Sequence, residues 1–158
     1  MDNQLAPASY LKAFNILFFA LLAGQTIFAV IAFALRYSGL FTNSNETLEQ
    51  IFMYIVPAVY VIAVVSGTAI FRKRLPEIKA NVVFNEKLNA YRAVYILRFA
   101  LVEGATLFAI ITYLITGRQM FILLAMLSIF SFFVLKPSKN KLTNELELSS
   151  EETELISD

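Results

Sequence analysis

One carboxylate in the middle of an apolar segment has the clearest capacity for chemistry in this sequence. Glu103 lies near the midpoint of residues 93–115, AVYILRFALVEGATLFAIITYLI. This segment is long enough to cross a bilayer as a helix, which takes about 20 mainly apolar residues. A charge at the bilayer centre costs at least ~2.5 kcal/mol, so Glu103 is expected to face protein or water. Low dielectric disfavours the charged form, so this carboxyl group can exchange a proton near neutral pH or hold a cation.

Three further polar residues interrupt the apolar segments. Gln25 and Ser128 lie near the middle of the first and the last segment, so an amide, a hydroxyl and a carboxylate share a similar depth. Arg98 precedes Glu103 by five residues, about 7.5 Å along a helix and on a different face. We expect Arg98 to extend to the cytoplasmic interface or to pair with Glu103 of a neighbouring chain. The candidates for ion or proton binding are therefore Glu103, Gln25, Ser128 and Arg98.

The composition excludes several kinds of site. The 158 residues include no Cys and no His, which excludes disulfides, thiolate nucleophiles, imidazole bases and metal sites built from these residues. The sequence has no glycine-rich phosphate loop, no nucleophile with a base and no pair of catalytic carboxylates. We predict that the protein is not an enzyme and uses no cofactor or metal. A net charge of +1 gives no reason to expect nucleic-acid binding.

The apolar segments predict an all-α integral membrane protein. Hydrophobic residues make up 58% of the chain, against roughly 45–50% in soluble domains, and they cluster into four segments. We expect a transmembrane domain over residues 1–136 with spans at about 11–35, 51–71, 93–115 and 120–135, arranged as a four-helix antiparallel bundle. Asn45 or Thr47 is expected to cap the second helix.

Basic residues predict the orientation of these spans. The loop between the second and third spans is strongly basic, and we expect a helix over residues 76–92, with Tyr91 and Tyr95 at the membrane interface. Only Arg36 and Arg118 would lie outside if this loop is cytoplasmic, and both termini are then cytoplasmic as well. We expect a multi-pass protein of a bacterial inner membrane. The ten basic residues on the cytoplasmic side would be Lys12, Arg72, Lys73, Arg74, Lys79, Lys87, Arg92, Lys136, Lys139 and Lys141.

Two charged surfaces are expected on the cytoplasmic side. Arg72, Lys73 and Arg74 could contact anionic lipid headgroups, at about 1 kcal/mol per residue, or a protein partner. Residues 137–158 form a polar tail that is basic first and acidic later. We expect a solvated, partly helical tail. Alternatively, the tail docks on a partner through its apolar residues Leu142, Leu146, Leu155 and Ile156.

One stretch resembles a known family. Residues 99–115, FALVEGATLFAIITYLI, with the preceding Arg74-Leu75-Pro76-Glu77, resemble the ion-carrying helix and the polar loop of rotary ATP synthase c subunits, the proteolipids. The resemblance covers about Ser66 to Ile115. It implies that Glu103 is an ion-carrying carboxylate and that Arg74 and Glu77 match loop positions facing a rotor stalk. The repeated glycines of the family's inner helix are represented here only by Gly67, and Arg98 has no counterpart in the family.

Two functions remain open from the sequence. In the first, the protein is an ion- or proton-coupled membrane protein that acts through Glu103, within the lipid bilayer and as a homo-oligomer or a subunit of a membrane complex. In the second, Glu103 is protonated or paired and only joins helices. The protein is then a non-catalytic membrane subunit or scaffold, and its basic loop and acidic tail dock a cytoplasmic protein partner.

Overall fold

Four long helices and two short ones make up the described chain. The computed structural model describes residues 7–40 and 46–156, and Asn45, one of the two expected caps, lies outside them. The structure is 88% helix, and no strand occurs among the described residues. The helices are α1 (Pro7–Tyr37), α2 (Glu46–Lys79), α3 (Phe84–Thr116), α4 (Gln119–Val134), α5 (Lys139–Leu146) and α6 (Ser150–Leu155).

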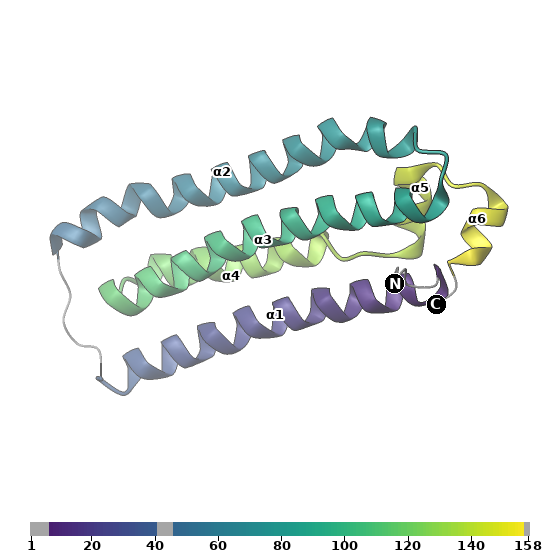
Figure 1. Ribbon diagram of the computed structural model, residues 1–158. Helices are drawn as coiled ribbons and strands as arrows, with labels where there is room; N and C mark the ends of the chain where they lie inside the picture. Colours follow the sequence, from purple (N-terminus) through teal and green to yellow (C-terminus); the bar gives the residue numbers. More distant parts are fainter. Residues whose placement is uncertain (1–6, 41–45, 157–158) are drawn as a thin grey trace, which may run out of the picture.

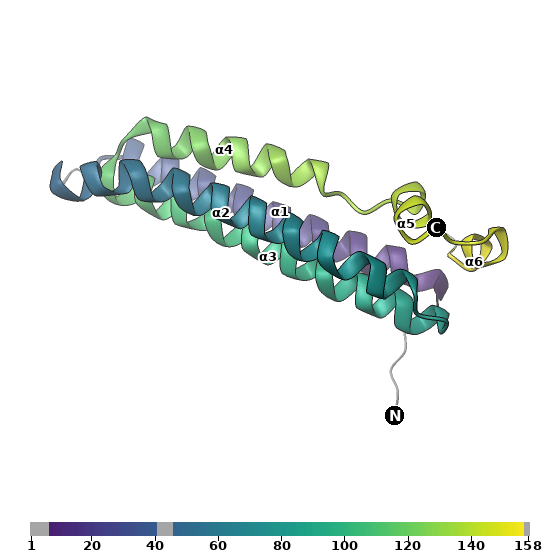
Figure 2. The same cartoon turned by 90° about the horizontal axis from the view of Figure 1, so that it is seen from above.

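The four long helices lie side by side, with α3 at the centre. Figure 1 shows α1 and α3 running in one direction and α2 and α4 in the other, with α1 and α2 on opposite sides of α3. Seen at right angles in Figure 2, α1, α2 and α3 form one layer and α4 packs on one face of it. The α3 helix therefore contacts all three other long helices, and it carries more of the buried residues than any other described helix.

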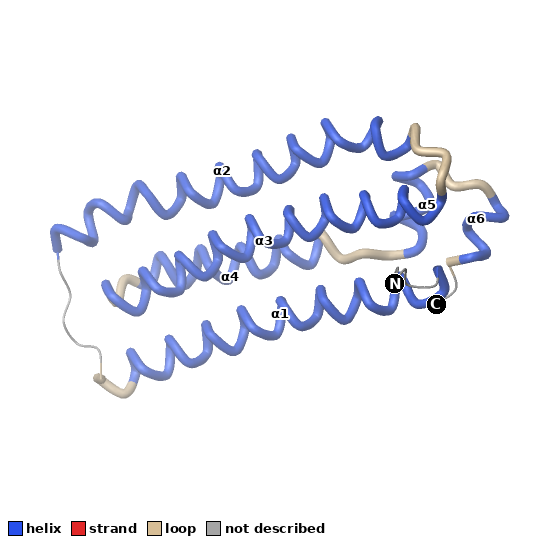
Figure 3. Tube along the Cα trace, in the orientation of Figure 1, coloured by secondary structure: helices blue, strands red, loops and turns tan. Residues whose placement is uncertain are grey.

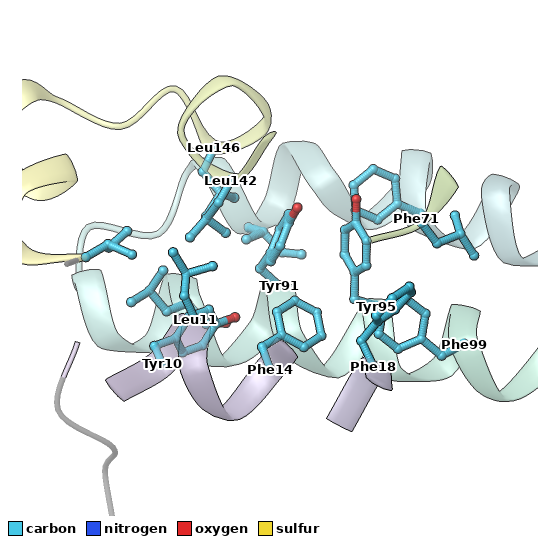
Figure 4. Close-up of a cluster of buried hydrophobic side chains, with 14 of the residues drawn as sticks. Tyr10, Leu11, Phe14, Phe18, Phe71, Tyr91, Tyr95, Phe99, Leu142 and Leu146 are labelled. Carbon is cyan, nitrogen blue, oxygen red and sulfur yellow. The ribbon is translucent and has the colours of Figure 1, made fainter. Parts of the chain in front are cut away.

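Aromatic side chains fill the half of the bundle that lies next to α5 and α6. Phe99 of α3 is fully buried, and its ring lies 5.2–5.8 Å from the rings of Phe14, Phe18, Tyr95 and Phe132. Rings at these separations attract one another beyond the effect of burial alone. This aromatic cluster joins α1, α3 and α4, and Figure 4 shows Phe14, Phe18 and Phe99 together with the tyrosines of α3.

Helix length and composition are compatible with a membrane protein. Helices α1, α2 and α3 are each long and apolar enough to cross a bilayer. The α4 helix has 16 residues, about 24 Å at 1.5 Å per residue, which is shorter than a ~30 Å hydrocarbon core. It makes a fourth crossing only if it forms one span with α5, to which it is bent by 70°.

The expected helix over residues 76–92 is divided in the structure. Pro76 lies inside α2, which continues to Lys79, and α3 begins at Phe84. The break falls at residues 80–83. Asn81 stabilises this turn, because its side-chain oxygen accepts a hydrogen bond from the Val83 backbone N–H at 3.0 Å. The basic loop is therefore a tight connection between two long helices.

The tail also differs from the expected solvated segment. Residues 139–155 form α5 and α6, which fold back against the end of the bundle (Figure 1). Leu142, Leu146 and Ile156 are 0–2% exposed and belong to the same hydrophobic core as the aromatic cluster, whereas Leu155 is 54% exposed. The surface on which three of the four apolar tail residues dock is therefore this chain's own bundle.

We predict that Phe99→Ala destabilises the protein strongly. The substitution removes a ring that contacts four others and leaves a cavity, which costs about 3 kcal/mol or more. Thermal unfolding in detergent measures this loss. The matched control is Phe130→Ala, because Phe130 is 69% exposed on α4. Equal stability of the two variants would contradict the central position of Phe99.

Candidate functional site

Glu103 lies on the flank of α3, not inside the bundle. Residues at helical spacing along one face of α3 are exposed, and Glu103 is half-buried beside this face. The space around the neighbouring Gly104 is open, since a Cβ atom there would meet nothing within 4 Å. We call this surface the open face of α3, and it consists of Ala93, Leu97, Ala100, Gly104, Ile111 and Ile115.

The Glu103 carboxyl group has no partner within the described chain. No hydrogen bond and no ion pair joins it to any residue in the described ranges. An ionised carboxylate without a partner is costly at the apolar centre of a span. Within a bilayer, Glu103 must therefore be neutralised by a proton, by a cation, or by a group from another molecule.

Gln25 and Ser128 lie in a buried polar layer together with Thr106. All three side chains are at most 1% exposed. The Thr106 and Ser128 hydroxyl oxygens are 2.6 Å apart, and the Thr106 hydroxyl also donates to the Val102 carbonyl at 2.8 Å. Along α1, α3 and α4 these residues fall between the two hydrophobic clusters of the core, so they share one level of the bundle.

The side-chain amide of Gln25 is buried without a partner among the described residues. Neither its oxygen nor its nitrogen makes a hydrogen bond there. A buried polar group in this state costs about 1–3 kcal/mol. Sequence reasoning placed Gln25, Ser128 and Glu103 at a similar depth. In the structure Ser128 is bonded to Thr106, while Glu103, one turn before Thr106 on α3, lies toward the open face.

Arg98 points between α2 and α4 rather than toward Glu103. Its Nη2 donates to the Thr68 hydroxyl oxygen at 3.3 Å, and its guanidinium carbon lies 5.5 Å from the centre of the Phe71 ring. Gly67 allows this packing, because a Cβ at that position would lie 3.2 Å from Cγ of Arg98. Within the described chain Arg98 has no carboxylate partner at ion-pair distance.

The tail is held by a carboxylate that the sequence did not single out. Glu145 of α5 accepts hydrogen bonds from the Tyr91 hydroxyl at 2.6 Å and from the Tyr95 hydroxyl at 3.0 Å. Both tyrosines are buried within the protein, and their expected position at the membrane interface stays a prediction. Figure 4 shows them between the phenylalanines of α1 and the α5 leucines, Leu142 and Leu146. The periodic leucines of the tail were the only sequence signal of this contact.

The basic loop and the acidic tail pair with each other. Lys79 Nζ lies 2.6 Å from a carboxylate oxygen of Glu147, and Lys87 Nζ lies 3.7 Å from one of Glu152. Both surfaces that the scaffold hypothesis assigned to an external partner are thus partly engaged within the chain. The remaining cationic surface is the exposed group of Arg72, Lys73 and Arg74, of which Arg74 pairs with Glu77 at 2.9 Å.

Comparisons of the chain with protein-family models, curated proteins and solved structures gave no match. The resemblance of residues 66–115 to rotary ATP synthase c subunits therefore stays a prediction.

We predict that acid loosens the tail from the bundle. The hydrogen bond from Lys79 lowers the pKa of Glu147, and the Ser149 backbone N–H, with Lys87, lowers the pKa of Glu152. A lowered pKa in the docked state stabilises docking at neutral pH, and this contribution is lost as the pH falls through that lowered pKa. Spin labels at Asn89→Cys and Ser150→Cys measure the distance, and its distribution should broaden on acidification.

The chain has no natural cysteine, so the two labels attach only where they are placed. The control is the Glu147→Gln, Glu152→Gln double variant, which lacks both titrating groups and should show the broad distribution already at pH 7. The same narrow distribution at pH 7 and at a pH low enough to protonate both carboxyl groups would show that these ion pairs do not hold the tail.

Proposed function

We propose that the chain is a four-span integral membrane protein whose Glu103 takes up a proton or a cation at the flank of the third span. The observation that carries this proposal is the isolation of the carboxyl group. Glu103 is half-buried in the middle of an apolar helix and has no partner in the described chain. Ionisable groups in such a position mark functional sites more often than not.

The location of Glu103 supports a role at the surface of the bundle. The buried polar side chains among the described residues are few, and the threonines Thr106, Thr112 and Thr116 each donate to a carbonyl one turn earlier. Gln25 and Ser128 belong to a layer enclosed by apolar clusters. Glu103 instead borders the open face of α3, where a second copy or another subunit has access to it. We therefore propose ion or proton exchange within an oligomer or a membrane complex.

The proposed orientation places α5 and α6 in the cytoplasm. The start of α1, the connection from α2 to α3, and the tail helices lie at one end of the molecule (Figure 1). By their positions in the sequence, ten basic residues lie at or near that end of the molecule, whereas Arg36 and Arg118 lie at the other end. The excess of basic residues in short loops favours the cytoplasmic side. Both termini are then cytoplasmic, with α4 as the shortest crossing.

A second candidate function rests on the exposed cationic surface. Arg72 and Lys73 are exposed at the end of α2 and have no partner in the described part of the chain. A membrane subunit that docks an acidic cytoplasmic protein, or anionic headgroups, would use these two residues with Arg74. This function does not need Glu103 to titrate.

We predict that a hydrophobic carbodiimide modifies Glu103 in proteoliposomes, because the reagent attacks protonated carboxyl groups in apolar surroundings. The rate of modification should fall as the pH rises, and a bound cation should protect the group. Mass spectrometry of the labelled peptide measures the rate, and flux across the liposome membrane measures function. Glu103→Gln should abolish both the labelling and any coupled proton or cation flux.

The matched control is Glu77→Gln, which removes an exposed carboxylate outside the apolar part of α2. This variant should keep the labelling and the flux. Failure of Glu103 to react, together with unchanged flux in Glu103→Gln, would leave the docking subunit as the remaining function.

We predict opposite accessibilities for the two ends of the molecule. An impermeant maleimide added to intact cells should label Gln119→Cys, next to the connection from α3 to α4. It should label Ser150→Cys, in the tail, only after the membrane is opened. Labelling of Ser150→Cys in intact cells would reverse the proposed orientation without affecting the role of Glu103.

A further inference from the structure

A cavity between α2 and α4 is lined in part by Arg98. The cavity has a volume of about 230 Å³. Helices α2 and α4 make few contacts with each other, so α3 forms the floor of the cavity. The residues that line it are Val64, Arg98, Val102, Ser131, Val134 and Leu135.

The cavity has an apolar wall and one strong hydrogen-bond donor, the side chain of Arg98, most of whose N–H groups make no hydrogen bond within the described chain. Ser131 already bonds to the Tyr60 hydroxyl at 2.8 Å and donates to the Leu127 carbonyl at 2.9 Å. Arg98 carries five N–H donors, of which one bond, to Thr68, is made within the described chain. Arg98 therefore brings to the wall of the cavity several unused donors and a positive charge without an ion-pair partner in the described chain.

The local charge around Arg98 is positive. Lys141 lies close enough for the two cations to repel each other, and its ammonium group donates to the Val134 carbonyl at 3.2 Å. Glu145 is the acidic group near Lys141, and its carboxylate accepts bonds from Tyr91 and Tyr95. Two cations and one carboxylate leave a net positive charge at this end of the cavity.

The depth of the cavity matches a lipid headgroup. Its lining includes Val134 and Leu135, the residues at which α4 ends, so Arg98 lies at the level where the chain leaves the apolar layer. Lys136 and Pro137 follow directly. In the proposed orientation this level is the cytoplasmic leaflet, where the anionic lipids of a membrane are concentrated.

We propose that this cavity binds an anionic phospholipid, with Arg98 bonded to its phosphate group. A guanidinium group matches two phosphate oxygens in a bidentate arrangement. The phosphate neutralises the charge that no carboxylate of the described chain neutralises, and the valines and Leu135 contact the start of the acyl chains. The lipid thereby fills the gap between α2 and α4. This site is separate from Glu103 and does not depend on its titration.

Titration of the delipidated protein in detergent with phosphatidylglycerol tests the site, with bound lipid counted by native mass spectrometry. Arg98→Gln should weaken binding about tenfold, because a hydrogen bond to a charged group is lost. The matched control is Lys73→Gln, which removes one exposed positive charge at the same end of the protein and should change affinity less than twofold. Val64→Phe fills the cavity, keeps the charge and should also weaken binding.

Phosphatidylcholine, whose choline offsets the phosphate charge, should bind more weakly than phosphatidylglycerol. Equal loss in Arg98→Gln and Lys73→Gln would show a diffuse charge effect and overturn the site. Unchanged binding in both Arg98→Gln and Val64→Phe would overturn it as well. Glycerol phosphate at millimolar concentration should not displace the lipid, and displacement would assign the cavity to a soluble phosphate ester instead.

Discussion

In hydrocarbon, polar groups must be satisfied by the protein itself, and several hydroxyl contacts within the long helices meet this constraint. The hydroxyls of Thr26, Thr106, Thr112 and Thr116 each donate to a carbonyl four residues earlier on their own helix. The buried Glu49 is paired with Arg118. Gln25, Arg98 and Glu103 are among the groups that lack sufficient partners in the described part of the chain.

The α3 helix contacts all three other long helices, and each of its faces makes different contacts. One face carries Tyr91, Tyr95 and Phe99, which join α1, α4 and the tail in one aromatic core. Another face approaches α2 closely at Gly67, which leaves room for the stem of Arg98. No described residue covers the open face, so a group that neutralises Glu103 there must come from outside the described residues.

The sequence predicted the helical segments well because apolar length alone defines them. It did not predict the tail correctly, since charge density in residues 145–154 suggests a solvated segment while Leu142 and Leu146 settle its position. The break at residues 80–83 was missed because Pro76 indicates a helix start, whereas here it lies within α2. The pairing of Ser128 with Thr106, and the distance of both from the open face, depend on helix rotation, which spacing along the chain does not determine.

Arg98 and Glu103 illustrate how one helix can carry two opposite charges that do not neutralise each other. Five residues separate them by about 140° around the helix axis beyond a full turn, so Arg98 faces the gap between α2 and α4 while Glu103 borders the open face. If the two groups shared a face, an internal ion pair would satisfy both and neither would need an external ligand. Their separation is why we propose a different occupant for each charge: a phosphate at the membrane surface for the guanidinium group, and a proton or cation at mid-span for the carboxyl group.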